Sequence, residues 1–178
     1  MKKKKTTKIR ENITEVEYQK LLIYLNGKEN LTANTKNNLK RTFILLFYTG
    51  MRINEVKQLK VKDIDTIIKK EELIIITHKR RKERKLFFSK ESIKQIKKHF
   101  TFSDDAKDND YIITVKGNPF KTPSSSTYIS NVNSFIQEVL RHRYSLHSFR
   151  SGLITEMSKL INPRFIQKFI AHSDVRLL

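Results

Sequence analysis

The sequence predicts a mainly α-helical fold with a small antiparallel β-sheet inserted as a hairpin. Across most of the chain, apolar residues recur every three or four positions, which is the period of a helix with one buried face. Between residues 64 and 88 the period changes to two, which is typical of short strands. The 178 residues are enough to bury a core. We expect one domain over residues 13–178 after a basic leader over residues 1–12.

The N-terminal part of the chain is predicted to form three helices. Thr14 and Glu17 have the spacing of a capping box and precede an apolar run, so the first helix begins there. Gly50 follows the apolar stripe of the second helix and is the residue type expected at a helix end. The expected helices cover residues 14–25, 33–49 and 53–59.

The middle of the chain is predicted to form the sheet. The three expected strands cover residues 64–68, 73–77 and 84–88. Between the last two lies K-R-R-K-E-R-K, residues 79–85, in which six of seven residues are basic. We interpret this segment as the basic tip of a hairpin.

Helical spacing returns in the C-terminal part. Polar loops are expected at residues 103–110 and 116–126, with a short extended segment at 111–113 between them. Asn162 and Pro163 have the pattern of a helix start, with proline at the first helical position. The expected helices cover residues 89–100, 126–141 and 146–160, and a last one begins after residue 162.

The composition indicates a polyanionic partner. The chain has 37 Lys and Arg against 18 Asp and Glu, a formal charge of +19, and this balance favours nucleic acid. The absence of cysteine excludes disulfides, thiol catalysis and Cys-ligated zinc, and five scattered histidines do not indicate a metal cluster. No apolar run approaches the roughly 18 residues that would span a membrane, and no apolar region follows the lysines at 2–5 as in a secretory signal. We therefore expect a soluble intracellular protein, although charge alone does not separate DNA from RNA or an anionic membrane.

Five residues in four segments stand out when they are considered together. Arg52 lies at a loop-to-helix junction in T-G-M-R-I-N-E, and Lys79 opens the basic hairpin tip. His147 and Arg150 are three residues apart in H-S-F-R, so on a helix they share a face. His172 follows an apolar helix in A-H-S-D. Taken singly, each has an ordinary explanation as a solvated cation or a capping side chain.

In this order, the set resembles the tyrosine recombinase (phage integrase) family, over residues 14–176. Residues 45–65, L-L-F-Y-T-G-M-R-I-N-E-V-K-Q-L-K-V-K-D-I-D, are similar to the first signature of that family. Residues 78–88 are similar to its β-hairpin with the catalytic lysine. H-S-F-R-S-G followed by F-I-Q-K-F-I-A-H-S-D-V is similar to its second signature. Three motifs in the right order are far more specific than one.

The resemblance implies the DNA breaking-rejoining catalytic fold and site-specific cleavage and rejoining of DNA through a phosphotyrosine. Arg52 and Arg150 would clamp the scissile phosphate, since each guanidinium offers a planar, permanently charged donor fork. Lys79 would protonate the leaving 5′ oxygen, and the like charges around it would lower its pKa. His147 would act as a general acid or base, His172 would hydrogen-bond the phosphate, and Glu55 would orient the first arginine. The residues expected to contact DNA are Arg80, Arg81, Lys82 and Arg84.

The resemblance also implies partners and surroundings. It implies double-stranded DNA as the partner and self-association on that DNA. It implies neither a metal nor a cofactor, and no membrane. We expect such a protein in the cytoplasm, at the nucleoid.

The sequence departs from the family pattern at both ends. The nucleophilic tyrosine is expected about nine residues after His172, near position 181, and the sequence ends at Leu178. Truncation, decay of the gene, or donation of the tyrosine in trans would each account for this. The separate helical clamping domain that precedes most family members is also absent from the 12-residue leader.

Two alternatives to a recombinase stay open from the sequence. The first alternative is a non-catalytic DNA-binding remnant of such an enzyme. An RNA-binding domain is a weaker alternative, because the chain lacks tryptophan and its aromatic residues lie at core spacing.

Overall fold

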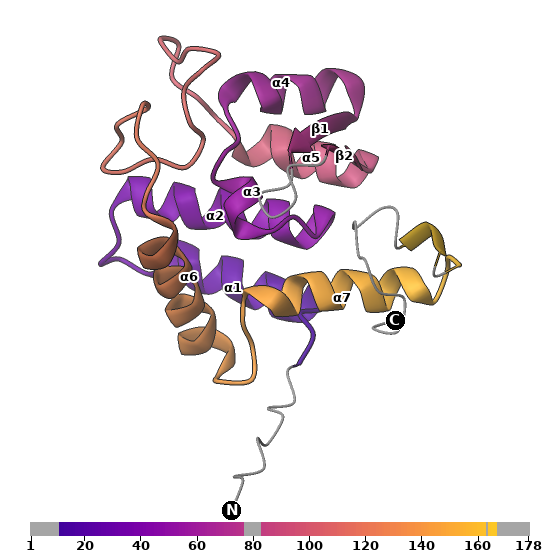
Figure 1. Cartoon of the computed structure of the whole chain (residues 1–178). Coiled ribbons are helices and arrows are strands. Elements are labelled where there is room, and N and C mark those ends of the chain that lie inside the picture. The colour runs from indigo at the N-terminus through magenta and orange to yellow at the C-terminus, as the bar shows by residue number, and fades with distance from the viewer. Residues whose placement is uncertain (1–10, 77–82, 163, 167–178) are drawn as a thin grey trace, which may run out of the picture.

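In the computed structural model, helices pack around one long helix, and two short strands lie among the helices of the upper half of the view (Figure 1). The structure describes residues 11–76, 83–162 and 164–166. The elements are α1 (Glu15–Gly27), α2 (Ala33–Thr49), α3 (Ile53–Val56), α4 (Val61–Lys70), β1 (Glu72–Ile76), β2 (Glu83–Phe87), α5 (Lys90–His99), α6 (Ser125–Leu140) and α7 (Leu146–Ser158). The predicted fold class, mainly helical with a small antiparallel sheet, is confirmed.

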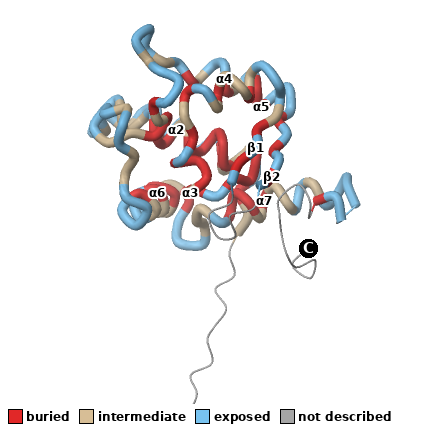
Figure 2. Tube along the Cα trace, turned by 45° about the horizontal axis from the view of Figure 1, so that its top comes forward, coloured by how far each residue is buried: buried red, intermediate tan, exposed pale blue. Residues whose placement is uncertain are grey.

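Helix α2 is the centre of the core. It contacts α1, α3, α5 and α7, and Figure 2 shows buried residues along most of its length. At its start, the side chain of Thr32 accepts a hydrogen bond from the backbone N–H of Thr35 at 3.2 Å. At its end, Gly50 has a left-handed φ of 59°, and its N–H donates to the Leu46 carbonyl at 3.1 Å. The helix stop predicted at Gly50 is therefore confirmed.

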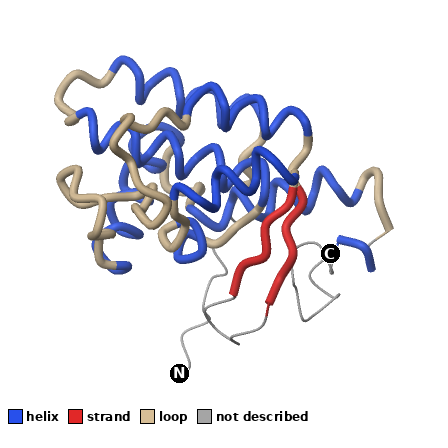
Figure 3. The backbone as a smooth tube through the Cα atoms, turned by 90° about the horizontal axis from the view of Figure 1, so that it is seen from above, coloured by secondary structure: helices blue, strands red, loops and turns tan. Residues whose placement is uncertain are grey.

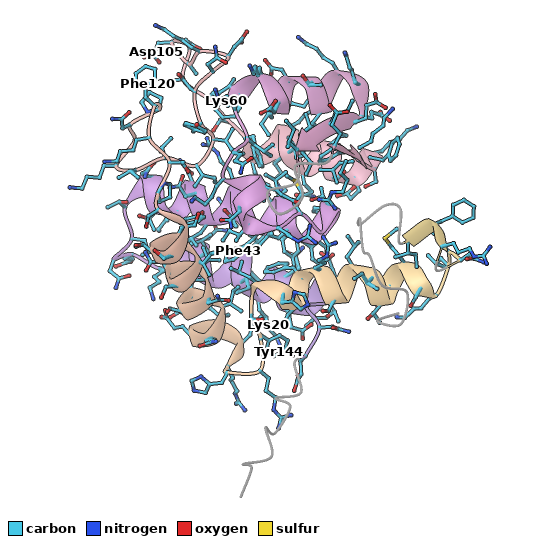
Figure 4. All side chains as sticks on the ribbon, in the orientation of Figure 1. Lys20, Phe43, Lys60, Asp105, Phe120 and Tyr144 are labelled. Atoms are coloured by element: carbon cyan, nitrogen blue, oxygen red, sulfur yellow. The ribbon has the colours of Figure 1, made fainter. Side chains whose placement is uncertain are left out.

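Aromatic contacts fix the neighbouring helices on α2. Phe43 lies at the middle of the molecule (Figure 4), and its ring stacks on that of Phe149 from α7 with centroids 5.7 Å apart. On another face of α2, Phe47 stacks on Tyr18 of α1 with centroids 4.2 Å apart. Because both contacts are buried or nearly so, they hold α1 and α7 in fixed positions beside α2.

The strand predicted at residues 64–68 is wrong, because this segment lies within helix α4. Its Asp63 side chain accepts from the backbone N–H of Lys60 at 2.8 Å, which caps the helix start. Ile64 and Ile67 are fully buried, three residues apart on one helical face. A short apolar run fits either period, and here packing against α5 and β1 favours the helix.

The other two predicted strands are confirmed and form an antiparallel pair, which Figure 3 shows running side by side away from the helices. In the pairing register, Leu73 lies opposite Leu86 and Ile75 lies opposite Arg84. These four side chains face inward and are buried. The sheet therefore has two strands in the described residues, not three.

The C-terminal part also follows the predicted pattern, with α5, α6 and α7 near the expected ranges. The extended segment predicted at 111–113 contributes an isolated bridge between Tyr111 and Lys60. Of the predicted last helix, residues 164–166 are helical, and the residues that follow lie outside the described part. Among the described residues no helix is long and apolar enough to cross a membrane.

The chain before α1 contacts α7 closely. The N–H of Ile13 donates to the Ser148 carbonyl at 3.1 Å, and the Asn12 side chain donates to Thr155 at 2.9 Å. A Cβ on Gly152 would lie 2.2 Å from the Ile13 carbonyl oxygen, so glycine permits this approach. The side chain of Asn12, the last residue of the predicted basic leader, therefore also contacts α7.

Candidate active site

The end of α2 places Arg52 at the surface. After Gly50 reverses the chain, Met51 is buried and Arg52 becomes the residue that starts α3. Half of the Arg52 side chain remains exposed to solvent. The T-G-M-R turn therefore anchors the backbone in the core at Met51 and directs the guanidinium of Arg52 outward.

Arg150 approaches the same turn from α7. It is 5% exposed, and its Nη1 donates to the Gly50 carbonyl at 2.7 Å. Burial lowers its pKa to about 10, with further lowering by the positive charges of Arg52 and Arg84. It is still charged at neutral pH. Two segments that are far apart in sequence thus place two guanidiniums on one turn.

Glu55 connects Arg52 to a third arginine. Its Oε1 accepts from Arg52 Nη1 at 3.3 Å, and its Oε2 accepts from Arg84 Nη2 at 2.7 Å. Oε2 also accepts from the backbone N–H of Arg52 at 2.8 Å. Glu55 is 3% exposed, so these hydrogen bonds replace the hydration that its carboxylate would have in water. Glu55 therefore contacts both the backbone and the guanidinium of Arg52, and its role in orienting that arginine stays a prediction.

A cavity of about 290 Å³ opens beside these groups and is lined by Arg52, His147 and Arg150. His147 is exposed, and it lies one turn before Arg150 on α7, so the two share a face as the spacing predicts. The remaining wall is largely apolar and is made by Leu46, Met51, Ile53, Ile129, Asn133, Ser145 and Leu146. An exposed imidazole and two guanidiniums around one recess can bind an anion and move a proton beside it.

Comparison with known proteins identifies the family. The model of the phage integrase family matches residues 11–178. The chain belongs to the phage integrase family.

Its relatives are recombinases. The chain is 28% identical over 137 residues to a tyrosine recombinase of Agathobacter rectalis, which covers 75% of this chain and 43% of that protein. It is 27% identical over 147 residues to the tyrosine recombinase XerC of Lactobacillus leichmannii, covering 76% and 47%. The chain therefore spans less than half the length of these relatives.

A solved structure shows the same fold. The Tn1549 transposon integrase in complex with transposon right end DNA superposes with a TM-score of 0.68 at 16% identity, covering 97% of this chain and 61% of that one. At this identity the likeness establishes the fold. The predicted resemblance to the phage integrase family is confirmed by the family match.

Several predicted site residues of this family lie outside the described residues, and their roles stay predictions. These residues are Lys79, Arg80, Arg81, Lys82 and His172.

Arg84 differs from its prediction. It was expected in the exposed hairpin tip as a DNA contact, but it lies within β2, faces inward and is 4% exposed. The alternation along β2 explains this, because Arg84 shares a face with the buried Leu86. The same alternation was visible in the sequence, and a buried arginine requires an acidic partner, which Glu55 provides.

The six tyrosines of the chain lie away from this cavity. All six lie within the described residues, and none of them lines the cavity beside Arg52 and Arg150. Burial raises the pKa of Tyr128, whose hydroxyl bonds Thr42 at 2.7 Å. Burial and a hydrogen bond to Glu11 raise the pKa of Tyr144 to about 12. None of the six tyrosines thus lies at the cavity, and the position of the nucleophile beyond residue 178 stays a prediction.

Proposed function

We propose that this chain is the phosphate-binding catalytic region of a site-specific recombinase that cleaves and rejoins duplex DNA through a phosphotyrosine. The observation that carries the proposal is the convergence of Arg52, His147 and Arg150 on one cavity. It is supported by membership of the phage integrase family and by relatives named as tyrosine recombinases.

The chemistry follows from the charge of the reaction. Attack on a phosphodiester places additional negative charge on the non-bridging oxygens. Arg52 and Arg150 are preorganised to receive that charge, because Glu55 and the Gly50 carbonyl already hold their guanidiniums. A fixed pair of donors stabilises the transition state more than the ground state, which accelerates cleavage.

The remaining roles rest on the family resemblance. His147 would move a proton at the nucleophile, Lys79 would protonate the leaving 5′ oxygen, and His172 would hydrogen-bond the phosphate. The nucleophile would be a tyrosine near position 181, beyond the 178 residues of this sequence. The formal charge of +19 favours tracking of the DNA backbone, and we propose that copies associate on DNA at the nucleoid.

A covalent-adduct assay tests this function. A target duplex is first selected from a randomised library by binding to the chain, and a nick is then placed beside the cleavage position to trap the product. We expect a chain extended to carry a tyrosine near position 181 to form a protein–DNA adduct, and the 178-residue chain to bind without forming one. Binding without an adduct from the extended chain would instead identify a non-catalytic DNA-binding protein.

A further inference from the structure

The carboxylate of Glu55 is shared unequally between two arginines. Its contact with Arg84, 2.7 Å, is shorter than its contact with the guanidinium of Arg52, 3.3 Å. The Arg84 side chain is 3% exposed and the Arg52 side chain is 50% exposed. The buried arginine therefore forms the closer ion pair, and the arginine at the cavity forms the looser one.

This arrangement determines how much positive charge Arg52 presents to a ligand. A buried carboxylate with a single cationic partner binds that partner closely, because the unpaired charge would be costly in the interior. If Arg52 were that single partner, Glu55 would draw it inward and compensate its charge. Because Arg84 already pairs with Glu55, the guanidinium of Arg52 can remain half exposed beside the cavity.

We propose that Arg84 is a positioning residue of the phosphate site, which acts through Glu55 to keep the charge of Arg52 available to the phosphate. The inference rests on the proposed function, in which Arg52 and Arg150 bind that phosphate. It also replaces the predicted role of Arg84 as a DNA contact, since this side chain lies on the inner face of the sheet.

The position of Arg84 in the sheet fits this role. Its backbone is fixed in β2 opposite Ile75 of β1, in a strand pair that packs against α4. Among the described residues, nothing accepts a hydrogen bond from its Nε or Nη1, so its contact with Glu55 is made through Nη2. The charges of Arg84 and Glu55 thus largely neutralise each other.

The charge count gives the expected effect. Arg52, Arg84 and Arg150 with Glu55 carry a formal charge of +2, and their mutual influence is visible in the lowered pKa of Arg150. A phosphodiester carries one negative charge, and a second develops in the transition state. Replacing Arg84 by glutamine would reduce the group to +1, whereas replacing both Arg84 and Glu55 by glutamine would restore +2.

The test uses the 178-residue chain and inorganic phosphate as the probe. Arginine side-chain N–H resonances of the 15N-labelled protein are followed by NMR, and the dissociation constant is taken from the Arg150 signal. We expect R84Q to weaken phosphate binding by about tenfold, the size expected for one unit charge about 10 Å away at an effective dielectric constant of about 20. We expect R84K, which keeps the charge, to stay within about threefold of the unmodified chain.

The double variant R84Q/E55Q distinguishes this role from a purely structural one. We expect it to bind phosphate within about threefold of the unmodified chain and better than R84Q, because the two charge changes cancel. A double variant no better than R84Q, or an R84Q that binds as well as the unmodified chain, would overturn the inference. If R84Q does not fold, R84K decides: it keeps the charge and should bind phosphate within about threefold of the unmodified chain, and a larger loss would overturn the inference.

The unmodified chain separates this inference from the proposed function. If it shows no phosphate-dependent change at Arg150, the phosphate site itself is wrong and the proposed function fails. If it binds phosphate at Arg150 and the R84Q and R84Q/E55Q results go against expectation, only the role of Arg84 fails.

Discussion

Replacing Arg150 by alanine should separate catalysis from DNA binding. In the folded chain this guanidinium is buried, faces the cavity and donates to the Gly50 carbonyl at 2.7 Å. A preorganised donor to a developing oxyanion contributes about 3–4 kcal/mol to transition-state stabilisation. We therefore expect the cleavage rate of R150A to fall by at least about 10²–10³-fold, because the lost donor is charged. If about five phosphates are bound, losing one contact should reduce the salt slope by about 0.9 and affinity only several-fold.

The measurement compares single-turnover adduct formation with equilibrium binding. Cleavage is followed with the tyrosine-extended chain on the nicked duplex, and affinity is followed by fluorescence anisotropy at several salt concentrations. Arg41 offers a matched control, because it also donates to two backbone carbonyls, of Ile112 at 2.9 Å and Thr101 at 2.7 Å, but does not line the cavity. We expect R41A to lower the melting temperature without changing the ratio of cleavage to binding.

Two outcomes would refute the reasoning. Equal losses in cleavage and in affinity would mean that Arg150 contributes ground-state binding rather than transition-state stabilisation. An R150A variant that cleaves at the unmodified rate while remaining folded would remove Arg150 from the site altogether. Thermal melting of each variant shows whether a lost activity reflects unfolding.

Four further expectations follow from the same observations. Binding of the chain to duplex DNA should weaken with salt at a slope of about −4 to −5 in log K against log salt, and a flat response would exclude DNA as the partner. In the extended chain, K79A should slow cleavage, and a substrate with a better leaving group than the 5′ oxygen should restore it, because such a group needs no proton; absence of rescue would count against Lys79 as the acid. Hydrogen bonds from Tyr144 and Arg143 lower the pKa of Glu11 below its ordinary value of 4.5, so E11Q should be less stable than the unmodified chain at pH 7, and the difference in urea melts should vanish as pH falls through that lowered pKa. G152A should destabilise the fold by about 1–3 kcal/mol in the same melts, because its methyl group would collide with the Ile13 carbonyl; unchanged stability would mean that the N-terminal segment moves freely.

Local signals in the sequence were enough to place most helices. The capping box at Thr14 holds in the structure, where the Glu17 carboxylate accepts from the Thr14 N–H at 3.1 Å. The stop at Gly50 holds because only a left-handed residue turns the chain there. Residues 64–68 failed because Ile64, Ile67 and Ile68 fit both periods, and the choice was made by contacts with α5 and β1 that the local sequence does not contain.

The sequence predicted that Arg52, His147 and Arg150 would lie together, but not which groups they contact. The spacing of His147 and Arg150 gives their common face, and family motifs give Arg52. The sequence does not show that Arg150 donates to the carbonyl of Gly50, because that contact depends on how α7 packs on α2. Arg84 was misplaced for a related reason: its position within a basic run suggested solvent, whereas strand alternation turns it inward.

The charge of the cluster argues that it was not arranged for stability. Three arginines lie near one carboxylate, Glu55, which pairs with Arg52 and Arg84. Two of the three, Arg84 and Arg150, are buried. Desolvated like charges oppose folding, and Arg150 shows this strain in a pKa lowered by burial and by its two neighbours. A stable core could replace such a group with apolar side chains at little loss or even a gain. Under the proposed function, a bound phosphate would offset the cost of placing these like charges close together, so a cluster that opposes folding would favour binding of the scissile phosphate.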